Sequence, residues 1–263
     1  MANKNMLLQR LDDIGRSLEK RADAIALIGL GSAGIETDRI DEFSDLDFFV
    51  ISAPGSKQPF IDCLDWLEEI CPLAYRFKNC ELGYKFLFDD GIYGEFAVFE
   101  PEELNSALYT GGRMIWKRSS SINDDIVAGK TPLASIRGSS IDHFAGEAVT
   151  NLYVGLGRYL RGEKLSALKF IQSYPIDGLL SVLHLLEPET EYFPDAFGNE
   201  RRMERRFPQM AKAMGGLLQG YDKTPESALL LLEYLESIYP VNARMSQEIR
   251  ALAMRCINQR IEG

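Results

Sequence analysis

The sequence has few of the residues that build structural metal sites or disulfide frameworks. Its 263 residues include only 4 cysteines and 2 histidines, and no two cysteines form a Cys-x-x-Cys pair. We therefore expect neither a zinc site nor a disulfide framework. No apolar run approaches the ~18 residues that suggest a membrane span. The first residues lead directly into an amphipathic segment, so we predict no signal peptide, no membrane association and a cytoplasmic location.

The sequence also lacks an excess of positive charge. Its formal net charge is −10, and most of the acidic excess lies in residues 1–137. Such a surface repels the phosphate backbone, so we predict no nucleic-acid partner. An acidic cleft instead attracts a cationic small molecule.

Two aspartates at the start of an apolar strand are the main chemical signal. An apolar run, residues 25–28, is followed by the pair Gly31-Ser32 and then by a polar connection. Asp45 and Asp47 enter the next apolar run, residues 46–51. Side chains alternate along a strand, so both carboxylates point to one side, with Cα atoms roughly 6–7 Å apart. Oxygen ligands of this kind suit Mg²⁺ together with a substrate's phosphates, and the Gly-Ser turn offers N–H groups and a hydroxyl to those phosphates.

Two other interpretations of this stretch were considered. Gly29-x-Gly31-x-x-Gly34 also fits the dinucleotide-binding fingerprint. That fingerprint requires a helix between the two strands and an acidic residue at the far end of the second strand. The connection, residues 35–45, is too short and too polar for that helix, and the aspartates precede the strand. Asp45 and Asp47 could also be a solvated strand entrance without function.

A glutamate on a later strand is a further candidate acid. Residues 84–88 and 92–99 read as two strands joined by the turn Asp89-Asp90-Gly91, which predicts a hairpin. Glu95 lies in the second strand, where it can complete a metal site or act as a general base. Asp89, Asp90 and Glu100 are rival acids, and Glu95 can alternatively be a glutamate that faces water on an edge strand.

These residues resemble a known family. Gly31-Ser32, twelve intervening residues and Asp45-x-Asp47 resemble the signature of the polymerase-beta-like nucleotidyltransferase superfamily. The chain is most similar to the small antibiotic-modifying members, and residues 94–96 resemble the element that carries their third carboxylate. The resemblance implies Mg²⁺-dependent transfer of a nucleoside monophosphate from a nucleoside triphosphate, ATP being the expected donor. The acceptor would be a small-molecule hydroxyl, as in a lincosamide or an aminoglycoside, and pyrophosphate would be released.

The resemblance also implies roles for individual residues. Asp45, Asp47 and Glu95 would be the catalytic residues and the metal ligands, while Gly31 and Ser32 would bind phosphates. A basic residue of the C-terminal half would add a phosphate contact, and Lys169 is the candidate because its neighbours Phe170 and Ile171 imply partial burial. A second hypothesis is a non-catalytic nucleotide or small-molecule sensor with the same fold, either monomeric or homodimeric.

The periodicity predicts two domains of different class. Residues 1–120 should form an α+β (α/β) nucleotidyltransferase domain with a small mixed sheet flanked by helices. Residues 121–137 read as a linker, and residues 138–263 as an all-α substrate-binding domain. Helices are expected over residues 5–20 and 61–71, from a capping box at Ser139, from Thr224-Pro225, and after Pro240. The arginines of residues 201–206 are expected to pair with the acidic loop 187–200.

Overall fold

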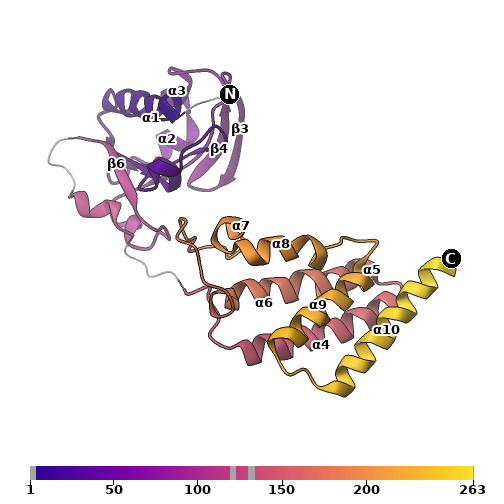
Figure 1. Ribbon diagram of the computed structural model, residues 1–263. Coiled ribbons are helices and arrows are strands. Elements are labelled where there is room, and N and C mark those ends of the chain that lie inside the picture. The colour runs from indigo at the N-terminus through magenta and orange to yellow at the C-terminus, as the bar shows by residue number, and fades with distance from the viewer. Residues whose placement is uncertain (1–3, 119–122, 130–133, 263) are drawn as a thin grey trace. The chain divides into compact units, whose positions relative to one another are not determined.

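A computed structural model describes residues 4–118, 123–129 and 134–262 (Figure 1). The chain divides into two compact units, Met1–Ala134 and Ser135–Gly263. Part of the predicted linker, residues 121–137, lies outside the described residues. The two units are described separately below.

The first unit is built on a mixed six-stranded sheet, with the strand order β3-β4-β5-β2-β1-β6. The strands are β1 (Ala24–Leu30), β2 (Leu46–Ser52), β3 (Leu73–Cys80), β4 (Gly83–Phe88), β5 (Tyr93–Phe99) and β6 (Gly112–Lys117). β2 and β5 pair in parallel, whereas the other neighbours are antiparallel. The predicted mixed sheet is confirmed, and so is the predicted hairpin of β4 and β5. β1 and β2 are antiparallel, so these two strands do not form the parallel β-α-β arrangement that a dinucleotide-binding fingerprint requires.

Three helices cover one face of this sheet: α1 (Lys4–Glu19), α2 (Gln58–Asp62) and α3 (Asp65–Glu68). The apolar side of α1 is buried in the same core as Phe48, Phe86 and Phe96 of the sheet. The helix predicted over residues 5–20 is thus confirmed. The single helix predicted over residues 61–71 is wrong, because the extended backbone of Cys63 ends α2 and a second short helix follows.

The opposite face of the sheet is covered only in part. Two turns, η3 (Glu103–Asn105) and η5 (Asp124–Val127), cover Ile28 and Ile51 at one end of the central strands. Leu104 and Ile126 from these turns complete this smaller core. The remaining part of this face, over β2, β5, β4 and β3, carries polar and aromatic side chains.

All described elements of the second unit are helical. They are α4 (Ile141–Leu160), α5 (Lys164–Leu168), the π-helix η6 (Lys169–Ser173), α6 (Tyr174–Val182), η7 (Leu183–Leu185), α7 (Met203–Arg206), α8 (Pro208–Leu217), α9 (Thr224–Ile238) and α10 (Ala243–Glu262). Leu152, Leu179, Leu232 and Ile249 are among the buried residues that form their common core. The predicted all-α class of this half is confirmed.

Two local predictions for this unit have different outcomes. The cap of α4 is Ser140 and not Ser139, since the Ser140 hydroxyl accepts a hydrogen bond from the His143 N–H at 3.0 Å. The predicted pairing between the arginine cluster and the acidic loop is confirmed. Arg206 binds Glu189 at 2.8 Å, and Arg202 binds Asp195 at 2.7 Å. Among the described residues, no helix is both long and apolar enough to span a bilayer.

Candidate active site

A row of four side chains crosses the uncovered face of the first unit. Asp47 of β2 lies directly opposite Glu95 of β5, Glu95 opposite Lys85 of β4, and Lys85 opposite Phe77 of β3. Residues that are opposite in neighbouring strands point to the same face, and adjacent strands are about 4.8 Å apart. The sheet therefore brings Asp47 and Glu95 together, although they are far apart in the sequence.

Asp47 is the most strongly perturbed carboxyl of this row. Burial, followed by the negative charges of Asp45 and Glu95, raises its pKa to about 7, while Lys85 and Arg39 act in the opposite direction. Asp45 is exposed at the strand entrance. The two neighbouring cations do not balance the three carboxyl groups of Asp45, Asp47 and Glu95, so this position favours an additional cation.

The turn after β1 reaches the same carboxylate. Gly31 has φ +53°, a left-handed conformation that a glycine adopts without steric cost. A Cβ atom at Gly31 would lie 3.8 Å from Asp47 Oδ2 and 3.9 Å from Arg39 Nη2. Gly31 is therefore adjacent to Asp47, and a glycine is needed at this position because of the left-handed backbone conformation of the turn. Ser32 follows it and is buried, so Gly31 is the more accessible residue of the predicted phosphate-binding pair.

The other two glycines of the stretch have a packing role. A Cβ at Gly29 would lie 2.6 Å from the Ala33 carbonyl oxygen, and a Cβ at Gly34 would lie 2.7 Å from the Gly29 carbonyl oxygen. The backbone of the turn thus folds back closely on the end of β1 and leaves no room for a side chain at either glycine. Arg113 of β6 fixes the turn by donating to the carbonyl oxygens of Ala33 and Gly34, at 3.2 and 3.3 Å.

Glu95 already has two polar partners. Asn79 Nδ2 donates to Glu95 Oε1 at 2.6 Å, and Lys85 Nζ lies 3.2 Å from Glu95 Oε2. Two of its rivals have structural roles, because Asp90 pairs with Arg10 at 2.5 Å and Glu100 accepts a hydrogen bond from the Gly55 N–H at 2.9 Å.

Lys169 does not have the burial that was predicted for it. It is exposed at the first residue of η6. Its neighbour Ile171 fills the core, which leaves the lysine on the outer side of the helix. It belongs to the second unit, whereas the three carboxylates belong to the first. Its phosphate contact stays a prediction.

Three polar neighbours of the carboxylates were not predicted from the sequence: Asn79, Lys85 and Arg39. The turn at residues 89–91 contained the signal for Lys85, since a hairpin centred there places residue 85 opposite residue 95. No comparable signal existed for Asn79, because its strand is joined through an irregular register next to Cys80. Arg39 is held by Glu36, with Nη2 and Oε2 2.7 Å apart.

Exposed aromatic side chains continue the row toward the edge strand. Phe77 is 52% exposed and Tyr75 is 53% exposed, and both lie on the face that carries Lys85. Tyr93 of β5, two residues before Glu95, is also exposed. Aromatic side chains left in water beside charged groups provide a flat surface on which a planar or apolar group can pack.

The donor set fits a hard divalent cation. Asp45 and Asp47 offer only oxygen atoms, and Asp47 is partly buried beside like charges. Mg²⁺ commonly binds through one or two carboxylates while it keeps several waters. Glu95 can be a third ligand, although Asn79 and Lys85 already occupy one side of each of its oxygens. Within the described residues, no three His, Cys, Asp or Glu side chains are already gathered closely enough to hold a metal.

Comparison with known proteins gives weak similarities. No protein family matches the sequence, and no curated protein is similar to it. An aminoglycoside 6-adenyltransferase from Bacillus subtilis superposes with a TM-score of 0.35 and 14% identity, covering 96% of this chain and 92% of that one. The Thermotoga maritima CCA-adding enzyme complexed with tRNA gives a TM-score of 0.38 and 12% identity, covering 95% and 72% of the two chains. Superpositions this loose do not define a family, so the functional argument depends on the residues of the site.

Proposed function

We propose that this protein is a Mg²⁺-dependent nucleotidyltransferase. It would transfer a nucleoside monophosphate from a nucleoside triphosphate to a hydroxyl group of a small molecule and release pyrophosphate. The observation that carries the proposal is the parallel pairing of β2 with β5, which sets Glu95 beside Asp47 next to the Gly31 turn. Three carboxylates beside a tight glycine turn suit a site that binds a cation and phosphates together.

The carboxylates have distinct roles in this proposal. Asp45 and Asp47 would hold the cation, and bound Mg²⁺ would neutralise charge on the α-phosphate and orient it for in-line attack. Glu95 would either complete the metal site or accept the proton of the attacking hydroxyl. The acceptor oxygen forms a bond to the α-phosphorus as the bond to the bridging oxygen breaks, and pyrophosphate leaves with that electron pair. Most of the rate enhancement would come from positioning and charge neutralisation.

Other side chains near the row would position the substrates. The Gly31 turn would bind the distal phosphates. Lys85 of β4, which is separated from Asp47 of β2 by β5 alone, is a cation on the same face. Phe77 and Tyr75 would pack against a planar or apolar part of the nucleotide or the acceptor. The net charge of −10 favours a cationic acceptor over a nucleic acid. Amine-bearing antibiotics, aminoglycosides and lincosamides, are therefore the acceptors to screen first.

A titration with matched variants tests the proposal. Triphosphates of all four bases are titrated calorimetrically into wild-type protein, Asp47→Asn and Asp12→Asn, with and without Mg²⁺. Asp12 is an exposed aspartate of α1, so its variant controls for the loss of one negative charge. We expect Mg²⁺-dependent binding in the wild type and in Asp12→Asn, and its loss in Asp47→Asn. Mass spectrometry of candidate acceptors then detects the gain of a nucleotidyl group.

A non-catalytic sensor is the second candidate. Glu95 accepts a hydrogen bond from Asn79 and forms an ion pair with Lys85. These contacts favour a sensor, because a carboxylate with two partners is less available as a metal ligand or a base. A sensor would bind a triphosphate without producing pyrophosphate from any acceptor. Triphosphate binding that needs no Mg²⁺ and survives Asp47→Asn would contradict the transferase proposal. Binding of no triphosphate in the presence of the screened acceptors would contradict the transferase proposal and would leave only a sensor of a small molecule.

A further inference from the structure

One exposed tyrosine lies beside the carboxylates of the candidate active site. Tyr93 is the first residue of β5, and its side chain is 38% exposed. It directly precedes Gly94, which pairs with Leu46 of β2, and Asp45 directly precedes Leu46. Because β2 and β5 are parallel, Tyr93 is the neighbour of Asp45 across the two strands.

The ring of Tyr93 lies on the face that carries Glu95 and Lys85. Side chains two residues apart on a strand share a face, so Tyr93 and Glu95 lie on the same side of β5. Tyr93 pairs with Leu87 of β4, which places Lys85 on its diagonal, within reach of an aromatic side chain. The hydrogen bond and the charge of Glu95 raise the pKa of Lys85, and the phenol of Tyr93 adds to this effect. The phenol oxygen is therefore close to the ion pair of Lys85 and Glu95.

The hydroxyl of Tyr93 is also the available one at this position. Ser32 is buried, and the Ser44 hydroxyl donates to Asp41 Oδ1 at 3.2 Å. Within the described parts of the chain, no hydrogen bond involves the hydroxyl of Tyr93. A phenol that is exposed and not hydrogen-bonded, beside the proposed metal ligands, can act as a nucleophile.

We propose that Tyr93 is an internal acceptor, so that the protein transfers a nucleoside monophosphate to its own tyrosine. The proposal rests on the proposed function and specifies a protein hydroxyl as a substrate of the same site. The phenol oxygen forms a bond to the α-phosphorus of the triphosphate as the bond to the bridging oxygen breaks. Pyrophosphate leaves with that electron pair, Glu95 accepts the phenol proton, and the product is a phosphodiester between Tyr93 and the nucleoside.

The neighbouring groups favour this step. A carboxylate within reach of a hydroxyl can accept its proton during the attack, which is the part that Glu95 plays. Lys85 stabilises the negative charge that develops on the phenol oxygen. Because the tyrosine belongs to the strand, the acceptor is already held at the site and no second molecule has to bind. The reaction stops after one nucleotide per chain, because Tyr93 has a single hydroxyl.

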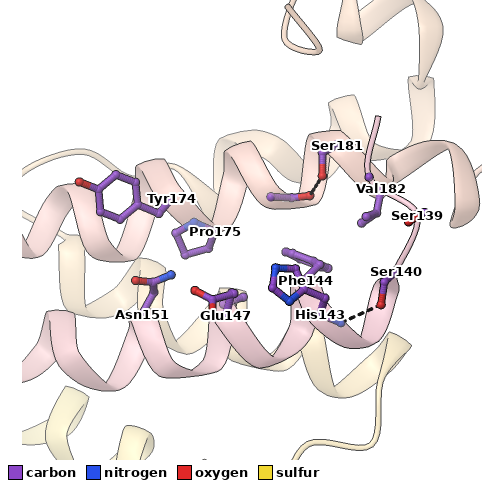
Figure 2. A pocket seen from close by; sticks show the side chains of 13 residues that line it. Ser139, Ser140, His143, Phe144, Glu147, Asn151, Tyr174, Pro175, Ser181 and Val182 are labelled. Carbon is purple, nitrogen blue, oxygen red and sulfur yellow. Dashed lines mark hydrogen bonds between the residues drawn. The ribbon is translucent and has the colours of Figure 1, made fainter. Parts of the chain in front are cut away.

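A second exposed tyrosine provides a matched control. Tyr174 of α6 is 48% exposed and lines a groove of the second unit, between α4 and α6. Figure 2 shows it near Asn151, and a single acid, Glu147, is among the described residues that line the groove. Tyr174 thus matches Tyr93 in exposure but lacks the group of carboxylates. Exposure alone would label both tyrosines, whereas the proposed reaction labels Tyr93.

Intact-mass spectrometry tests the inference. The full chain is incubated with Mg²⁺ and each of the four nucleoside triphosphates, and its mass is measured before and after, so that a label acquired during expression is counted. We expect the wild type to gain one nucleoside monophosphate less one water, and peptide sequencing to place it on Tyr93. Tyr93→Phe should lose the label, and Tyr174→Phe should keep it. Since Tyr93→Phe removes one oxygen and keeps the ring, it should still bind the triphosphate.

The outcomes separate this inference from the proposed function. No mass gain in the wild type, a label on another residue, or a label that persists in Tyr93→Phe overturns the inference. Mg²⁺-dependent triphosphate binding without a mass gain overturns the inference alone, because transfer to a separate acceptor is still possible. Absence of both the binding and the mass gain contradicts both proposals. Asp47→Asn should lose the binding and the label together.

Discussion

Glu189 holds two arginines whose environments differ, and this difference gives a prediction with an internal control. Its carboxylate lies 2.8 Å from both Arg206 and Arg137. The side chain of Arg206 is 3% exposed, whereas that of Arg137 is 39% exposed. Arg206 also carries a buried Nη1 that has no hydrogen-bond partner. Glu189 therefore compensates a buried charge on one side and a solvated charge on the other.

We predict that Glu189→Gln destabilises the protein by about 3 kcal/mol, because breaking a buried ion pair leaves an uncompensated charge and costs roughly 3–5 kcal/mol. The lower end applies because the Glu189 side chain is itself 22% exposed. Arg137→Gln should cost less than about 1 kcal/mol, as an exposed pair does. With a urea m-value of roughly 1–3 kcal/mol per molar, Glu189→Gln should lower the midpoint of urea unfolding by at least about 1 M.

The decisive measurement is whether the double variant is more or less stable than Glu189→Gln alone. Arg206→Met removes the buried charge and leaves Glu189 paired with Arg137, so it should cost less than Glu189→Gln. Glu189→Gln combined with Arg206→Met should be more stable than Glu189→Gln alone, since replacing a buried ion pair by an apolar residue is often neutral or stabilising. If the second substitution adds to the loss, or if Glu189→Gln costs no more than Arg137→Gln, the reasoning is refuted.

Acid unfolding of the same variants provides a second test. Burial alone would raise the pKa of Glu189, but the hydrogen bonds and charges of Arg206 and Arg137 outweigh it and hold the pKa below its usual 4.5. A carboxyl whose pKa is lower in the folded state stabilises the protein above its unfolded pKa. That contribution is lost as the pH falls through the folded pKa. The wild type should therefore lose more stability than Glu189→Gln when the pH is lowered below 4.5.

Two further predictions concern the turn and the thiols. Gly31→Ala should lower the free energy of unfolding, measured with urea, by about 1–2 kcal/mol, because an alanine at φ +53° has the strain of the left-handed conformation. Gly146→Ala, in open space on α4, should raise the free energy of unfolding by about 0.5–1 kcal/mol. Equal effects of the two substitutions would contradict the strain argument. Exposed Cys63 and Cys80 should react with a thiol reagent in the folded protein at pH 8. Cys256 should react only on unfolding, because burial raises its pKa to about 11. Rapid labelling of three or more thiols including Cys256 would refute its burial.

Much of the candidate site was readable from local sequence. The spacing of Asp45 and Asp47 predicts that both carboxylates lie on one side of a strand. In the structure β2 begins at Leu46, so Asp45 precedes the strand, and its charge still raises the pKa of Asp47. The turn signal at residues 89–91 predicted the hairpin that carries Glu95, and the same turn fixes its register. Local signals of this kind are reliable because neighbouring residues alone determine them.

The sequence by itself determined the acidic charge, the division into a mixed-sheet half and a helical half, and the choice of Asp45, Asp47 and Glu95 as candidate residues. Only the tertiary structure decided that β2 pairs in parallel with β5, which puts Glu95 beside Asp47 and brings Lys85 and Asn79 into the same site. Pairing of distant strands and helices depends on how all apolar faces are buried together, and no local pattern in the chain records that outcome.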